Sequence, residues 1–309
     1  MGLKIGIVGA GAVGTYYGAK LVHGGSDVHF LMRGDLTEVR RDGIFVKGED
    51  ENFRVEKIQA YSSPSEIGPR DLVIVAVKAT SNTEIVDLIP PLLDEKTMVL
   101  TLQNGLGNEE FLAKQFGADR VLGGLCFIAV DRHSKTQVER YAYGDVILGE
   151  FGRSAQQRTH EVAAEFSRAK IKCRVTDDLA LERWRKLIWN IPFNGLSIVA
   201  GGIDTAEILG DENFRQLTLD LMEEIIMAAN NCGFALKRDA WRKHIERTEK
   251  LARGYKPSTL QDWEAGKPLE VEAIWGEPLR RGLAAGVTMP RTEMLYVLLN
   301  TMDARRHSK

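Results

Sequence analysis

A glycine pattern near the N-terminus constrains the fold of this chain more than any other feature of its sequence. Gly9, Gly11 and Gly14 have the spacing G-x-G-x-x-G, with the apolar run 3–8 before them and a helical segment to about Gly24 after them. In this context the first glycine permits a tight turn, the second leaves room for a pyrophosphate, and the third lets helix and strand pack closely. The sequence therefore predicts a dinucleotide-binding turn, rather than a glycine-rich turn without a ligand, formed by Gly9, Ala10, Gly11, Ala12, Val13 and Gly14.

Short apolar runs alternate with helical stretches over the first half of the chain. Residues 27–32, 71–77 and 97–102 have strand-like sequences, and the last two are almost uniformly apolar. Such runs are typical of parallel strands that helices cover on both faces. Strand–helix alternation of this kind predicts an α/β fold with a Rossmann-type, doubly wound sheet.

The sequence changes character near residue 177, and a chain of 309 residues is long enough for two domains. Helical periodicity dominates beyond this point, for instance over 213–231, and all five tryptophans lie there. We therefore expect a dinucleotide-binding domain over residues 1–176 and an all-helical C-terminal domain over residues 177–309. From the apolar content of the helical domain we expect a homodimer.

Charge and cysteine content argue against several classes of function. The formal net charge is −2, from 41 basic and 43 acidic residues, which provides no general attraction to nucleic acid or to anionic lipid. No stretch approaches the ~20 apolar residues of a membrane span, and no signal peptide is expected because a glycine turn ends the first apolar run. The three cysteines are widely spaced, which suits a reducing compartment. We expect a cytoplasmic protein that acts on a small molecule.

The end of the second predicted strand indicates which dinucleotide binds. An enzyme that uses NAD usually carries an acid there, about 20 residues after the glycines, to hold the ribose 2′-hydroxyl. This strand instead ends at Arg33, whose guanidinium can form two charged hydrogen bonds to a 2′-phosphate. Asp35, two residues further on, is the rival that would favour NAD, and Arg33 could also be a solvated loop residue. We predict NADPH.

Polar side chains follow two of the predicted strands directly. Lys78 comes directly after the run 71–77, and Gln103-Asn104-Gly105 comes directly after the run 97–102. In open α/β sheets ligands bind beyond the carboxyl ends of the strands, so Lys78 and Asn104 are both predicted to face the cofactor. The alternative for the lysine is an ordinary surface charge.

A polar stripe is predicted on an otherwise apolar helix of the second half. Lys186, Asn190 and Asn194 are spaced i, i+4 and i+8, which places them on one helical face. Buried amide and ammonium groups need partners, since each unpaired one costs about 1–3 kcal/mol or more. A bound polar substrate would supply those partners, and an internal hydrogen-bond network would do so equally well.

Residues 258–276 contain further polar groups, among them Ser258 and Glu270, which by themselves are most simply surface residues. No metal site is predicted, because the six histidines are scattered and form no H-x-x-x-H pair. No G-x-S-x-G turn for a nucleophilic serine occurs either.

Taken together, these landmarks resemble the ketopantoate reductase family over nearly the whole chain. Their order and spacing match: the glycine pattern, Val77-Lys78, Gln103-Asn104-Gly105, K-L-x-x-N-x-x-x-N over 186–194, and S-x-L-Q-D from Ser258 with Glu270 twelve residues after that serine. The combination is specific, although no single member is. The resemblance implies NADPH-dependent reduction of 2-dehydropantoate (ketopantoate), a small 2-oxo acid, to pantoate in pantothenate biosynthesis.

The resemblance also implies a role for each matching position. Lys186 corresponds to the general acid that completes hydride transfer to C2, and Glu270 corresponds to a cofactor contact that also orients this lysine. Substrate-holding roles are implied for Asn190, Asn194, Ser258 and Asn104, the last of which also touches the cofactor. Cofactor contacts are implied for Arg33 on the phosphate side, for Lys78, and for the backbone of Ala129.

Three positions depart from the family pattern. Gly195 stands where proline is common, Asp204 where a further substrate asparagine is expected, and Leu269 where threonine is common. These departures keep open a related reductase of another 2-oxo or 3-hydroxy acid. A non-catalytic NADP-binding sensor is a second alternative, but such a sensor would not need Lys186 or the asparagine stripe.

Overall fold

The computed structural model describes residues 2–251 and 253–307. The chain divides into two compact units. The short loop Asn104–Gly107 belongs to the second unit, although the residues on either side of it belong to the first. Unit 1 comprises Met1–Gln103 and Asn108–Leu179, and unit 2 comprises Asn104–Gly107 and Ala180–Lys309.

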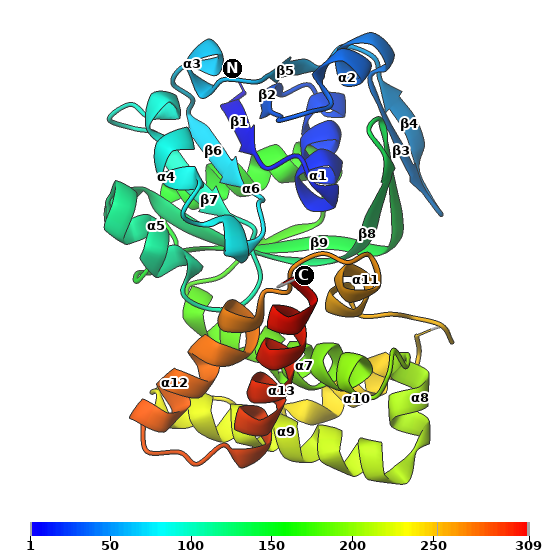
Figure 1. The fold of residues 1–309 in the computed structure, drawn as a ribbon. Helices are drawn as coiled ribbons and strands as arrows, with labels where there is room; N and C mark the ends of the chain where they lie inside the picture. Colours follow the sequence, from blue (N-terminus) through cyan, green and yellow to red (C-terminus); the bar gives the residue numbers. More distant parts are fainter. Residues whose placement is uncertain (1, 252, 308–309) are drawn as a thin grey trace. The chain divides into compact units, whose positions relative to one another are not determined.

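Unit 1 is built on one mixed sheet that contains ten strands within the described residues (Figure 1). The strand order is β4-β3-β9-β8-β7-β6-β1-β2-β5, and β10 pairs with β9. The strands are β1 (Lys4–Val8), β2 (Asp27–Leu31), β3 (Ile44–Gly48), β4 (Asn52–Val55), β5 (Gln59–Tyr61), β6 (Leu72–Val75), β7 (Met98–Thr101), β8 (Val121–Ser134), β9 (Gln137–Glu150) and β10 (Cys173–Val175).

The predicted doubly wound sheet is confirmed. Strands β5, β2, β1, β6, β7 and β8 pair in parallel, and β1, β6 and β7 are buried along almost their whole length. Side chains alternate between two cores, because successive residues of a strand point to opposite faces. Ile5 and Ile7 of β1 belong to one core together with Phe166, whereas Val8 belongs to the other with Ile67 and Leu112.

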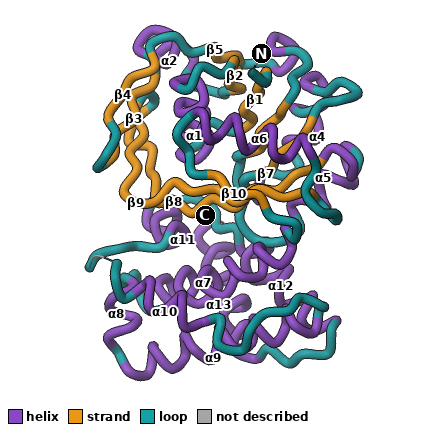
Figure 2. The backbone as a smooth tube through the Cα atoms, turned by 180° about the vertical axis from the view of Figure 1, so that it is seen from behind, coloured by secondary structure: helices purple, strands orange, loops and turns teal. Residues whose placement is uncertain are grey.

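Helices cover both faces of this sheet. Helices α1 and α6 lie side by side on the face that contains Phe166 (Figure 2), and α3, α4 and α5 contribute to the other core. The helices of unit 1 are α1 (Ala12–His23), α2 (Leu36–Asp42), α3 (Pro64–Ile67), α4 (Ile85–Leu88), α5 (Asn108–Phe116) and α6 (Gln157–Arg168), with 3₁₀ turns at Ala79–Ser81, Pro90–Leu92 and Ala118–Arg120.

A long antiparallel hairpin, which the sequence analysis did not predict, extends the parallel sheet. Strands β8 and β9 pair over most of their lengths, and β9 in turn pairs with β3, which carries β4 at the edge. Register shifts interrupt the hairpin on either side of residues 128–129. Charged residues interrupt the apolar pattern at the end of β8 and in β9, so the pattern that identified the other strands is weak there.

Unit 2 is helical, as predicted. Its first helix, α7, begins at the last residue of unit 1 and continues through Pro192. Within the described ranges, no helix is long and apolar enough to cross a membrane. The helices are α7 (Leu179–Val199), α8 (Thr205–Gly210), α9 (Glu212–Asn231), α10 (Trp241–Thr248), α11 (Ser258–Glu264), a π-helix at Glu272–Gly276, α12 (Glu277–Ala284) and α13 (Pro290–His307).

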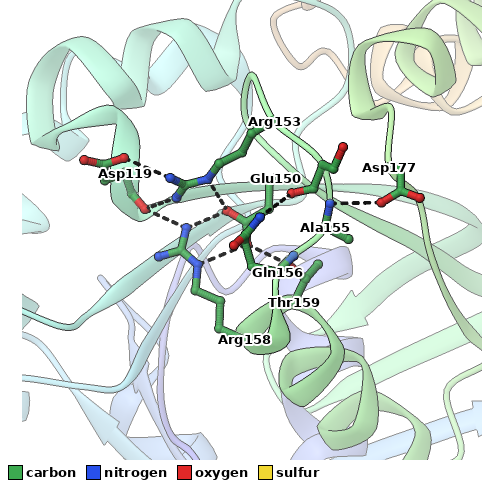
Figure 3. Close-up of polar contacts among 9 residues, drawn as sticks. Asp119, Glu150, Arg153, Ala155, Gln156, Arg158, Thr159 and Asp177 are labelled. Atoms are coloured by element: carbon green, nitrogen blue, oxygen red, sulfur yellow. Dashed lines mark hydrogen bonds and ion pairs between the residues drawn. The ribbon is translucent and has the colours of Figure 1, made fainter.

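A buried carboxylate joins the end of β9 to the start of α6. Glu150 is 1% exposed and accepts hydrogen bonds from Arg158 at 2.5 and 3.0 Å, from Thr159 at 2.6 Å and from Arg153 at 3.3 Å. Figure 3 shows both arginine side chains turned toward this carboxylate. Burial alone would raise the pKa of Glu150, but the hydrogen bonds from Arg158 and Thr159 hold it below its usual value.

We expect Glu150→Gln to lower the free energy of unfolding by about 2 kcal/mol at pH 7, because charged hydrogen bonds are lost and two arginines lose a partner. The depressed pKa means that the carboxylate stabilises the fold fully above the unfolded value of about 4.3. This contribution is lost as the pH falls through the lower folded pKa. Urea unfolding at pH 7 and pH 3.5 measures both effects. The exposed neighbour Glu161→Gln is the matched control, and an equal loss in both variants would contradict the expectation.

Candidate functional site

The glycine loop between β1 and α1 has a backbone that two of its glycines make possible. Gly9 has φ +104°, and a Cβ there would lie 2.5 Å from the backbone nitrogen of Val77. A Cβ on Gly14 would lie 2.0 Å from the carbonyl oxygen of Gly9. A Cβ on Gly11 would meet no atom within 4 Å, so this glycine borders open space that a side chain would fill. The loop therefore fits a pyrophosphate in the way its spacing predicts.

The N-terminus of α1 is suited to a phosphate. No side chain caps it, and its first turn contains no acidic residue, so its first N–H groups and partial positive charge have no competing anion from this turn. The Ala10 carbonyl accepts hydrogen bonds from Thr15 at 3.0 Å and from Arg132 at 2.6 Å. Arg132 was missed by the sequence analysis, because it lies in β8, 122 positions from Ala10, and belongs to no motif.

Arg33, the residue expected to bind a 2′-phosphate, lies just after β2 with a side chain that is 72% exposed. The Arg33 guanidinium forms an ion pair with Glu84 and donates a hydrogen bond to its carboxylate. This hydrogen bond holds the pKa of the Glu84 carboxyl below its usual value. Its rival Asp35 forms an ion pair with Arg132 at 2.8 Å instead. Each of the two residues thus has a partner of opposite charge from another part of unit 1.

Lys78 and its surroundings lie beyond the carboxyl ends of β6 and β7. Lys78 is exposed and precedes the 3₁₀ turn Ala79–Ser81. Side-chain amides hold the end of this turn in place. The Gln103 amide nitrogen donates to the side-chain oxygen of Asn82 at 2.7 Å, and the Asn82 amide nitrogen donates to the side-chain oxygen of Asn108 at 3.0 Å. Asn82 and Asn108 were not predicted from the sequence, since isolated asparagines carry no spacing signal.

Ala129, expected to offer a backbone contact, lies in β8 and is 7% exposed. The pairing with β9 shifts register between Ala129 and Val130. Ala129 itself remains paired with Ala142, and the extra residue at this shift, Tyr141, lies on β9.

In unit 2, the loop Asn104–Gly107 docks on the π-helix Glu272–Gly276. Leu106 donates its backbone N–H to the carbonyl of Ala273 at 2.8 Å. Gly105 has φ +85°, and a Cβ there would lie 2.2 Å from the same carbonyl oxygen. Only glycine permits both this backbone conformation and this close approach. Glu270 lies two residues before this π-helix and is 6% exposed.

This docking places Asn104 beside Lys186. The Lys186 ammonium donates a hydrogen bond to the side-chain oxygen of Asn104 at 2.6 Å. Lys186 is half-buried on α7, and the two residues are 82 positions apart in the sequence. The structure thus joins two residues that the sequence analysis assigned to different domains.

The remaining residues of the predicted stripe differ in their surroundings. Asn194 is 1% exposed; its amide nitrogen donates to the Asn190 carbonyl at 2.9 Å, and its side-chain oxygen accepts from the Thr259 N–H at 3.1 Å. Internal hydrogen bonds therefore engage both ends of this amide and tie α7 to the start of α11. Asn190 is 6% exposed, and its side-chain amide forms no hydrogen bond with another described residue. Ser258, the first residue of α11, is exposed.

The three departures from the family pattern have structural explanations. A Cβ on Gly195 would lie 2.5 Å from Leu295, so the glycine allows α13 to pack closely on α7. Asp204 caps α8, and its carboxylate accepts from the N–H groups of Glu207 and Gly254, both at 2.7 Å. Leu269 is buried in the helical core at 2% exposure. Each residue thus has a role in packing or capping.

Comparison with known proteins gives a consistent result for both units. The family model for ketopantoate reductase PanE/ApbA matches residues 5–153, and the model for the C-terminal part of that family matches residues 178–303. A 2-dehydropantoate 2-reductase from Nostoc sp. is 36% identical, over 99% of this chain and 97% of its own.

Two solved structures are similar along their whole length. A 2-dehydropantoate 2-reductase from Geobacter metallireducens is 44% identical with a TM-score of 0.94, covering 96% of this chain and 99% of its own. The enzyme of that name from Methylococcus capsulatus is 30% identical with a TM-score of 0.90, covering 98% and 97%.

Proposed function

Because this chain belongs to the ketopantoate reductase family, we propose that it reduces 2-dehydropantoate to pantoate with NADPH, a step of pantothenate biosynthesis. The observation that carries the proposal is the hydrogen bond between Lys186 and Asn104. It sets a proton-donating ammonium in a fixed position on the helix that also carries Asn190. A nucleotide-binding sensor would have no use for this arrangement.

The reaction requires a hydride and a proton. When bound at the glycine loop, NADPH would supply the hydride that C2 of the oxo acid accepts. The Lys186 ammonium donates the proton to the oxygen on which negative charge develops. Asn104 accepts one N–H of this ammonium and orients the others. Asn190 has an amide free for the substrate's oxygens, and Asn194 acts through the position of α11 rather than by direct contact.

For the cofactor, the proposal assigns the pyrophosphate to the glycine loop and the 2′-phosphate to Arg33. The Arg33–Glu84 pair is solvent-exposed, so its net contribution to stability is small and a phosphate can replace the carboxylate. The ratio of the KM values for NADPH and NADH tests this assignment. A lower KM for NADH would overturn it.

The overall function is tested by the loss of NADPH absorbance when 2-dehydropantoate is added. Pyruvate and 2-oxoisovalerate serve as controls for other 2-oxo acids. We expect rapid loss with 2-dehydropantoate and little with the controls. Equal or faster reduction of a control would assign the chain to a related reductase, and tight NADPH binding without any reduction would favour a sensor.

Asn190→Ala should raise the KM for the oxo acid by about tenfold, with kcat changed less, because one or two hydrogen bonds to the substrate are lost. Steady-state kinetics at saturating NADPH measures this effect. Asn231→Ala, at the exposed end of α9, is the control. An unchanged KM would remove Asn190 from the substrate site.

The proposal includes a homodimer formed through α13. Met294, Val297 and Leu298 are 65%, 54% and 44% exposed and are spaced i, i+3 and i+4, which gives one apolar face. A ketopantoate reductase from Staphylococcus aureus with this fold is dimeric. Light scattering on the wild-type protein and on Val297→Glu tests this assembly. We expect the wild type to be a dimer and the variant to be a monomer. A wild-type protein that is monomeric at micromolar concentration would refute the homodimer.

A further inference from the structure

Arg132 occupies an unusual position between the glycine loop and the loop that follows β2. One guanidinium nitrogen donates to the Ala10 carbonyl at 2.6 Å, and another lies 2.8 Å from the Asp35 carboxylate. The side chain is only 18% exposed, and its buried Nε has no hydrogen-bond partner among the described residues. This side chain thus links two cofactor-binding loops from a third element, β8.

The Asp35 carboxylate does not cap the helix that it precedes. Asp35 is the N-cap of α2, where an aspartate usually accepts a hydrogen bond from the first backbone N–H groups of the helix. No such bond forms here, and the carboxylate pairs with Arg132 instead. Asp35 lies two residues after Arg33, in the loop where a dinucleotide-binding fold recognises the adenosine ribose.

The electrostatic consequence concerns the 2′-phosphate. An unpaired carboxylate in this loop would repel a 2′-phosphate and could accept a hydrogen bond from a 2′-hydroxyl, which favours NADH. The half-buried Arg132 cancels this charge more effectively than an exposed cation would, because solvent screens it less. The same guanidinium keeps the Ala10 carbonyl oxygen occupied at the glycine loop.

We propose that Arg132 is a specificity-determining positioning residue, which makes the site selective for the 2′-phosphorylated cofactor by holding and neutralising Asp35. This inference rests on the proposed use of NADPH. Arg33 contacts the phosphate, whereas Arg132 acts through Asp35. The inference predicts that the effect of removing Arg132 depends on the presence of the Asp35 carboxylate.

Binding of two mononucleotides isolates the effect from catalysis. Isothermal titration with 2′,5′-ADP and with 5′-AMP gives a ratio of affinities that reports the 2′-phosphate alone, because both ligands carry the 5′-phosphate. Any general damage to the glycine loop lowers both affinities and leaves the ratio unchanged. We expect Arg132→Gln to lower this ratio by about tenfold. An unchanged ratio would overturn the inference.

The double variant Arg132→Gln/Asp35→Asn separates neutralisation from direct contact. If Arg132 acts through Asp35, the second substitution restores the ratio to within about twofold of wild type. A ratio that stays low means that Arg132 touches the phosphate itself, which refutes the proposal. Asp35→Asn alone keeps the arginine and should raise the ratio severalfold; an unchanged or lower ratio would also refute it.

Lys135→Gln is the matched control, because Lys135 lies in the turn of the same hairpin and pairs with Glu38 at 2.7 Å. We expect no change in the ratio for this variant, and a tenfold fall would attribute the effect to net charge instead. If the wild-type protein shows no preference for 2′,5′-ADP, the NADPH assignment fails and the inference fails with it. If the wild-type protein prefers 2′,5′-ADP and Arg132→Gln keeps the same preference, the inference about Arg132 is refuted while the NADPH assignment stands.

Discussion

Lys186→Ala should lower kcat for 2-dehydropantoate by roughly 10²–10⁴-fold, the usual range for the loss of a positioned general acid. The expected cause is the loss of the ammonium that Asn104 holds at 2.6 Å. The glycine loop and Arg33 belong to unit 1, so the affinity for NADPH should remain close to that of wild type. Stopped-flow reduction at saturating substrate and fluorescence titration of NADPH measure the two quantities separately.

The control for this variant is Arg185→Ala. Arg185 is the neighbouring residue on α7, is exposed and pairs with Glu182 at 2.7 Å, so its removal also takes one positive charge from the helix. We expect its kcat to be unchanged. A Lys186→Ala enzyme with near-normal kcat would exclude the general-acid role, and equal losses in both variants would point to the charge of α7 instead.

Gly105→Ala is expected to reduce kcat/KM by about 100-fold or more and to destabilise unit 2. The added Cβ would lie 2.2 Å from the Ala273 carbonyl oxygen, so the loop must move away from the π-helix. That movement would displace Asn104 and with it the hydrogen bond to Lys186. A misplacement of about 1 Å near a reacting group can cost about 10²-fold in rate.

Gly233→Ala distinguishes this overlap from backbone strain. Gly233 has φ +95°, but a Cβ there would meet no atom within 4 Å. The Gly233→Ala enzyme should therefore lose only about 1 kcal/mol in free energy of unfolding and retain its kcat/KM. Thermal unfolding and steady-state kinetics on both variants provide the comparison. A Gly105→Ala enzyme with wild-type kinetics would show that the docking of this loop does not position Asn104.

Much of unit 1 and of the helical character of unit 2 followed from local sequence rules. The uniformly apolar runs became β6 and β7, and the helical period over 213–231 became α9 (Glu212–Asn231). These elements were predictable because backbone conformation and burial impose a period on the sequence. The hairpin β8–β9 was not predictable in this way, since its residues are neither uniformly apolar nor strictly alternating.

The site was predicted less completely. The stripe of Lys186, Asn190 and Asn194 lies on one helix, as its spacing indicated. From the sequence, either a substrate or the protein could supply the partners of this stripe, and the structure gives Asn194 protein partners on both sides of its amide. Asp204, which stands where the family pattern expects a substrate asparagine, is the cap of α8. Side-chain roles of this kind depend on neighbours that spacing does not reveal.

The sequence by itself determined the glycine loop and the helix that carries the lysine, because φ preferences and helical spacing act within a few residues. Only the tertiary structure decided which distant residues complete these features. Packing brought Asn104 to Lys186 over 82 positions and Arg132 to Ala10 over 122 positions. Such pairings depend on the burial and close packing of whole elements, for which no local pattern in the chain is a substitute.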